Sequence, residues 1–69
     1  MREISVAQSI IDIAEANARK QNCSCIRTIK IRLGEFTTIV PEALELAFEI
    51  ARRGTLAEDA TLEIESVRE

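Results

Sequence analysis

The apolar and polar residues of this chain follow helical and strand-like patterns in alternation. From Val6 to about Asn22, apolar residues recur every three or four positions, which predicts an amphipathic helix. Ser5 is a favourable N-cap and Gln8 follows three residues later, so we expect this helix to begin just after Ser5. Its predicted apolar face consists of Ala7, Ile10, Ile11, Ala14 and Ala18.

Two segments alternate strictly between apolar and polar residues, which is typical of half-buried strands. The first covers 28–33 and ends at Gly34, and the second covers 60–67. The polar positions of the first segment are basic and those of the second are acidic, so neighbouring strands would form cross-strand ion pairs. The positions expected to face the core are Ile29, Ile31, Leu33, Leu62 and Ile64.

A second helix is predicted between the strands, from Pro41 to Arg53. Proline is well tolerated at the first helical position, and Gly54 is the residue expected just after the end. A strand, a helix and a strand in succession favour a right-handed crossover with parallel strands. We therefore predict a single α+β domain over 1–69 with the order α-β-α-β, in which two helices cover one face of a small mixed sheet.

Composition narrows the functional classes. The chain has 69 residues and a net charge of −3, which argues against nucleic acid or an anionic membrane as a partner, because phosphate binding needs clustered cations. There is no apolar run of about 18 residues, so we expect no membrane span. Two cysteines without a secretory leader predict a cytoplasmic protein. No set of residues typical of a catalytic centre is present, so we do not expect an enzyme.

Two places carry candidate metal chemistry. At the N-terminus, the Met1 α-amine, the amides of Arg2 and Glu3 and the Glu3 carboxylate could hold a metal ion in a planar array, but the chain has no histidine to complete it. Cys23 and Cys25 form either a soft-metal or redox pair, or two incidental thiols of which one packs into the core. Their spacing does not match a zinc-binding pair, so zinc is not expected.

Several short motifs occur together, in order and at matching spacing, over essentially the whole chain. They are Met-x-Glu-x-Ser at the start, Ile31-Arg32-Leu33-Gly34-Glu35-Phe36, Val40-Pro41-Glu42-Ala43-Leu44 with Phe48-Glu49, Gly54-Thr55, and Ala60-x-Leu62-x-Ile64. Together they resemble the HypA/HybF family of nickel-insertion accessory proteins, which help to mature nickel-iron hydrogenases. The resemblance implies nickel as the metal, a metallochaperone function, and a hydrogenase precursor or other maturation proteins as partners.

Two departures from the family bear on function. The resemblance implies a histidine nickel ligand at the second position, where this chain has Arg2, whereas Glu3 matches. A guanidinium stays charged and offers no lone pair to a metal. The resemblance also implies a zinc ribbon and a final strand after Glu69, which this sequence does not contain.

Two hypotheses remain open on these grounds. The chain is either a metallochaperone-type factor whose motif at Met1, Arg2 and Glu3 is degenerate at Arg2, or a metal-free interaction domain that kept the fold. Two strands alone leave two exposed sheet edges, and such edges recruit further strands. We therefore expect a homodimer, through edge pairing or exchange of an element, with 27–33 or 61–67 at the seam.

Overall fold

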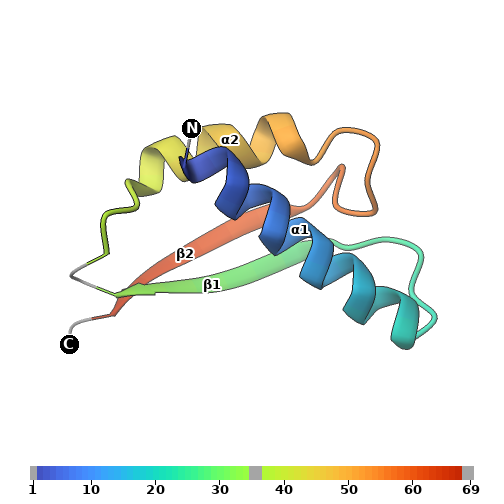
Figure 1. Ribbon diagram of the computed structural model, residues 1–69. Coiled ribbons are helices and arrows are strands. Elements are labelled where there is room, and N and C mark those ends of the chain that lie inside the picture. The colour runs from blue at the N-terminus through green and yellow to red at the C-terminus, as the bar shows by residue number, and fades with distance from the viewer. Residues whose placement is uncertain (1, 35–36, 68–69) are drawn as a thin grey trace.

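The computed structural model describes residues 2–34 and 37–67. Along the chain it contains α1 (Arg2–Lys20), β1 (Thr28–Gly34), α2 (Pro41–Ala51) and β2 (Thr61–Val67). Figure 1 shows both helices on the same side of the two strands. The predicted α+β fold with the order α-β-α-β is therefore confirmed, but the sheet of the described residues is parallel and not mixed as predicted, because the crossover through α2 returns the chain in the same direction.

The first helix begins earlier than the capping pattern predicts. α1 starts at Arg2, so Ser5 lies inside the helix, and Gln8 donates a hydrogen bond to Asp12 Oδ1 at 3.0 Å instead of reaching back to a cap. The expected start after Ser5 is wrong because residues of the additional turn make contacts with the segment before α2, described below. An acidic residue in that first turn, Glu3, also suits the positive end of the helix dipole.

The end of α1 is formed by a left-handed turn at Asn22, whose φ is 57°. The Cys23 amide donates to the Ala18 carbonyl at 2.8 Å, and the Asn22 amide donates to the Arg19 carbonyl at 3.1 Å. These two bonds form a Schellman motif, which satisfies carbonyl groups of the last helical turn. This turn reverses the direction of the chain, and β1 begins after it at Thr28.

The two strands are parallel and paired in register from Thr28 with Thr61 to Gly34 with Val67. The crossover between them contains α2, as the strand-helix-strand order predicts. The polar positions of both strands are exposed and the core-facing ones are half-buried. Within the described residues, the sheet thus has one face under the helices and one bare face.

The second helix is two residues shorter than predicted. α2 ends at Ala51, and the Arg52 amide caps it by donating to the Phe48 carbonyl at 2.9 Å. The chain then turns through Gly54, which has a φ of 74° that disfavours a side chain. The Arg52 side chain donates a hydrogen bond from Nη1 to the Ala60 carbonyl at 2.8 Å. This bond joins the end of α2 to the start of β2.

The core lies where the two helices meet above the sheet. Most of its fully buried residues are alanines, which let backbones approach closely, and Ile11, Leu44 and Phe48 supply the bulk. The predicted apolar face of α1 is confirmed, since Ala7, Ile11 and Ala18 are buried. Ile13 lies outside this core with 70% of its surface exposed. The buried cluster consists of Ala7, Ile11, Leu44, Ala47, Phe48, Ala57 and Ala60.

Candidate functional site

The predicted metal site lies in the first turn of α1. Arg2 and Glu3 belong to this turn, and Met1 lies outside the described residues. The part of the prediction that concerns the Met1 α-amine is therefore not described by the structure. Arg2 is exposed and Glu3 is half-buried.

Both described residues of the motif contact the segment that leads into α2. Arg2 Nη1 donates a hydrogen bond to Thr38 Oγ1. Glu3 Oε2 accepts a hydrogen bond from the Val40 amide at 3.4 Å. We call these two contacts the N-terminal clasp, because they join the start of α1 to Thr38 and Val40 in the segment that precedes Pro41.

The clasp supplies a capping interaction that α2 lacks locally. Val40 is the N-cap residue of α2, and its side chain cannot accept a hydrogen bond from the helix. The first turn of a helix carries unpaired amides and partial positive charge, both of which favour a carboxylate nearby. Glu3 therefore acts as an acidic group at the start of a second helix as well as at the start of its own.

The donor chemistry of the described residues is poor for nickel. The Arg2 guanidinium has no lone pair to give, and its Nη1 is occupied by Thr38. Glu3 contributes one carboxylate, a harder ligand than the nitrogen donors that nickel favours. Among residues 2–34 and 37–67, no three His, Cys, Asp or Glu side chains come together in a way that could hold a metal ion.

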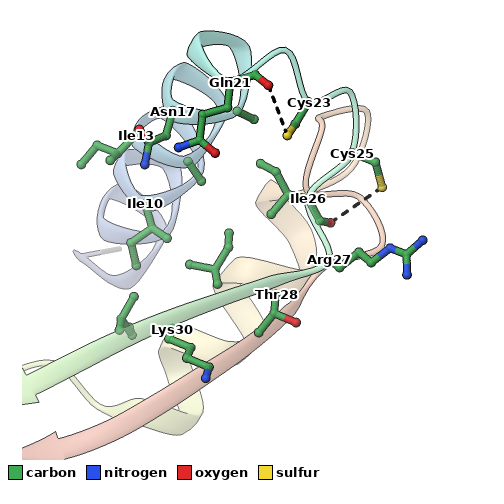
Figure 2. Close-up of a pocket in the computed structure, with 14 residues that line it drawn as sticks. Ile10, Ile13, Asn17, Gln21, Cys23, Cys25, Ile26, Arg27, Thr28 and Lys30 are labelled. Carbon is green, nitrogen blue, oxygen red and sulfur yellow. Dashed lines mark hydrogen bonds between the residues drawn. The ribbon is translucent and has the colours of Figure 1, made fainter.

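The second candidate pair, Cys23 and Cys25, lies in the connection between α1 and β1. Both thiols are free and exposed, so the expectation that one of them packs into the core is wrong. The Schellman turn that ends α1 holds Cys23 at the surface, and core positions nearby are filled by Ala18 and Ile26 instead. Each thiol donates a weak hydrogen bond to a backbone carbonyl nearby in its own loop: Cys23 Sγ lies 3.7 Å from the Gln21 oxygen and Cys25 Sγ lies 4.0 Å from the Ile26 oxygen (Figure 2).

The bare face of the sheet carries a basic row beside an acidic row. Lys30 is the register partner of Glu63, and Arg32 is the partner of Glu65. The Arg32 Nε atom lies 3.7 Å from Glu65 Oε2, which confirms a predicted cross-strand ion pair. Both side chains are largely exposed, so this pair adds little to stability.

Sequence reasoning did not find the partners of the N-terminal motif. Thr38 and Val40 are 36 and 37 positions away from Arg2 and Glu3, respectively. No periodic pattern links side chains at such separations, because periodicity reports only the local element. The one local signal was Pro41, which marks a helix start that has an apolar residue at its N-cap position.

The comparisons with known proteins decide the family. The model of one family, described as "Hydrogenase/urease nickel incorporation, metallochaperone, hypA", matches residues 1–69. This chain belongs to the HypA family. The family description is that of a nickel-incorporation metallochaperone and not of an enzyme, in agreement with the sequence.

Individual HypA proteins are similar over almost the whole chain. Proteins named hydrogenase maturation factor HypA from Methylocella silvestris and from a Picosynechococcus species are each 43% identical over 67 residues, which is 97% of this chain. The chain spans 59% of the length of each of these two relatives.

A solved HypA structure has the same fold. The solution structure of the Ni metallochaperone HypA from Helicobacter pylori matches 94% of this chain and 56% of its own, with a TM-score of 0.88 and 30% sequence identity. The resemblance drawn from the short motifs is thus confirmed for both family and fold.

In the described part of this chain, neither helix is long and apolar enough to cross a membrane.

Proposed function

We propose that this chain is the nickel-side domain of an accessory factor that supplies nickel during maturation of nickel-iron hydrogenases. Nickel is the cargo, and a hydrogenase precursor or other maturation proteins are the partners. The observation that carries the proposal is the family match over residues 1–69, supported by the TM-score of 0.88 with a Ni metallochaperone. The proposed place of action is the cytoplasm, where free thiols such as Cys23 and Cys25 persist.

The proposed cargo site is the motif Met1, Arg2 and Glu3, which is degenerate at Arg2. The nitrogen donors available there are the α-amine and the backbone amides, and the imidazole implied by the family resemblance is absent. Because one nitrogen ligand is missing, we expect this chain to bind nickel weakly.

A metal-free interaction domain is the second candidate function. The N-terminal clasp favours it, because Arg2 and Glu3 have structural partners in Thr38 and Val40. In that case the motif stabilises the junction between α1 and α2, and the domain serves maturation through protein contacts alone.

Nickel titration of an untagged protein with a free Met1 amine separates the two functions. We expect weak heat signals for the parent and tight binding for Arg2→His, since a neutral imidazole completes the planar nitrogen set. Arg2→Gln is the matched control, because it removes the guanidinium without adding a metal ligand.

Each result has a definite meaning. Tight binding by the parent rejects the metal-free function. Equal affinities of Arg2→His and Arg2→Gln show that position 2 is not a nickel ligand in this chain. Weak binding by the parent with a clear gain in Arg2→His supports a degenerate motif.

We also propose that the chain forms a homodimer. Neither nucleic acid nor a membrane is proposed as a partner. The described sheet has two strands and therefore two open edges, and a chain of 69 residues gains from additional burial. Light scattering is expected to give about twice the 7.7 kDa of one chain. A mass of 7.7 kDa with a melting temperature independent of concentration contradicts the dimer.

A further inference from the structure

The segment Cys23-Ser24-Cys25 forms an exposed bend between α1 and β1. Both thiols are free and exposed, and the chain changes direction at Ser24. Figure 2 shows the two cysteines on successive parts of this loop, each with its sulfur near a backbone carbonyl. A thiol is a weak hydrogen-bond donor, so these contacts hold the side chains only loosely. Both sulfurs can therefore turn toward a shared ligand at little cost.

Two backbone amides of the bend are available as well. The loop is fastened at both ends by the amides of Cys23 and Ile26, which donate to carbonyl groups at 2.8 and 3.0 Å. Between these anchors, the amides of Ser24 and Cys25 donate to no backbone carbonyl among the described residues. A metal ion that displaced their protons would therefore break no backbone hydrogen bond of the fold.

The two sulfurs and the two amide nitrogens make up the ligand set of a square-planar nickel(II) ion. Nickel(II) favours planar ligation by nitrogen, and a thiolate adds an anionic donor at each end of the set. The four atoms follow one another along the chain, so they close three adjoining chelate rings of five or six atoms. We propose that Cys23-Ser24-Cys25 is a nickel(II) site in which both thiolates and the deprotonated amides of Ser24 and Cys25 bind the ion.

This donor set needs neither a histidine nor a third side chain. It is therefore compatible with a chain that has no histidine, and in which no three ligating side chains come together among residues 2–34 and 37–67. The choice of nickel as the ion rests on the proposed function, whereas the donor atoms come from the loop itself. Zinc prefers a tetrahedral set and would find only two thiolates here, so nickel is the better match.

The charges around the loop favour the complex. Two thiolates and two deprotonated amides outweigh the charge of the ion, so the complex carries a net negative charge. Arg19 and Lys20 precede the loop and Arg27 follows it, and all three are exposed. The sequence from 19 to 27 contains no acidic residue. These cations attract the anionic complex, and no carboxylate in the segment repels it.

Binding releases the protons of both thiols and both amides to solvent, and the ion remains nickel(II). Because protons are products of the reaction, the affinity rises with pH. We expect the site to bind weakly near pH 7, in keeping with the weak heat signals expected for the parent. At about pH 8.5 we expect binding to be at least about a hundredfold tighter.

The test is a titration of the complete isotope-labelled chain with nickel sulfate in anaerobic buffer at about pH 8.5. Carbon-detected NMR observes the amide nitrogens directly, and a square-planar nickel(II) complex is diamagnetic, so neighbouring signals stay sharp. We expect the nitrogens of Ser24 and Cys25 to shift more than any others, up to one equivalent of nickel. A thiolate-to-nickel charge-transfer band should grow with the same stoichiometry. Zinc sulfate is the control metal and is expected to leave both amides protonated.

Matched variants separate the two kinds of ligand. The double variant Cys23→Ser with Cys25→Ser is expected to lose the charge-transfer band. Ser24→Pro keeps both thiols but has no amide proton to release, and is expected to weaken binding at least about a hundredfold. Ser24→Ala keeps the amide and should bind nickel as the parent does. Circular dichroism of each variant shows that the fold is retained.

Three results would overturn the proposal: no charge-transfer band in the parent, equal nickel affinity of Ser24→Pro and Ser24→Ala, or unchanged nickel binding in the double cysteine variant. The last of these would leave the proposed function standing, because nickel would then be held elsewhere in the chain. Conversely, a thiolate band in the parent, with no gain from Arg2→His in the double cysteine variant, would support the loop site and reject the N-terminal motif as the cargo site.

Discussion

Glu15 connects α1 to the loop between α2 and β2, and its removal is expected to destabilise the fold. Glu15 Oε2 accepts a hydrogen bond from the Leu56 amide at 3.0 Å, across 41 positions of sequence. The side chain is only 17% exposed, and its other oxygen lies 3.8 Å from Arg19 Nη2. In Glu15→Ala the Leu56 amide loses its acceptor in a half-buried position.

The expected loss is about 2 kcal/mol of the free energy of unfolding. A hydrogen bond to a charged group contributes about 1.5–3 kcal/mol, and leaving a buried donor unpaired costs a similar amount. The ion pair with Arg19 adds only a few tenths, since the Arg19 side chain is 66% exposed. For a chain of 69 residues, total stability is roughly 3–10 kcal/mol, so the loss is a large fraction of it.

Urea unfolding followed by circular dichroism measures this loss. Glu15→Gln keeps an acceptor oxygen and is expected to lose about half as much as Glu15→Ala. Glu45→Ala, at an exposed position of α2, is the matched control for removing one glutamate from a helix. If Glu15→Ala and Glu45→Ala differ by less than about 0.5 kcal/mol, the bond to Leu56 does not stabilise the fold as argued.

Three further predictions concern the core, one turn and the thiols. Ile11→Ala is expected to cost about 3 kcal/mol in urea unfolding because Ile11 is fully buried, whereas Ile13→Ala should change stability by less than about 0.5 kcal/mol; equal effects would contradict the assigned core. Gly54→Ala is expected to cost about 1 kcal/mol through its φ of 74° alone, since nothing lies within 4 Å of an added Cβ; an unchanged urea midpoint would refute this. Cys23 and Cys25 should both react with a thiol reagent in the folded protein at rates close to those in urea; protection of either one would show that it is covered in solution.

The elements of this fold were predictable where the pattern is local. Alternation in 28–33 and 60–67 is a direct result of strand geometry, and both segments are strands. Pro41 likewise marks the start of α2. The start of α1 was not predictable from Ser5 and Gln8, because the contacts of Arg2 and Glu3 with the segment before α2 lengthen α1.

The candidate site shows where sequence reasoning stops. The pairing of Glu15 with Arg19 follows from helical spacing and is present, but the more buried contact of Glu15 is with the Leu56 amide. A backbone amide carries no sequence signature, so no residue pattern points to such a partner. The Val40 amide, which donates to Glu3, escaped prediction for the same reason. The Thr38 hydroxyl, which accepts from Arg2, lies 36 positions away and so beyond the reach of any local pattern.

The parallel register has a consequence for the kinetics of folding. Thr28 pairs with Thr61 and every later pair of the two strands is separated by the same 33 positions. The loop between the strands must therefore close before the first pair forms. The loss of chain entropy on closure occurs with this first pair, and the other six pairs of the seven add no further loop closure. Strand pairing does not stabilise the sheet until α2 has folded back over it, and then all pairs form together. The amides that bond between β1 and β2 should consequently lose protection in one cooperative event, and the pairing should form at a rate set by topology rather than by either strand alone.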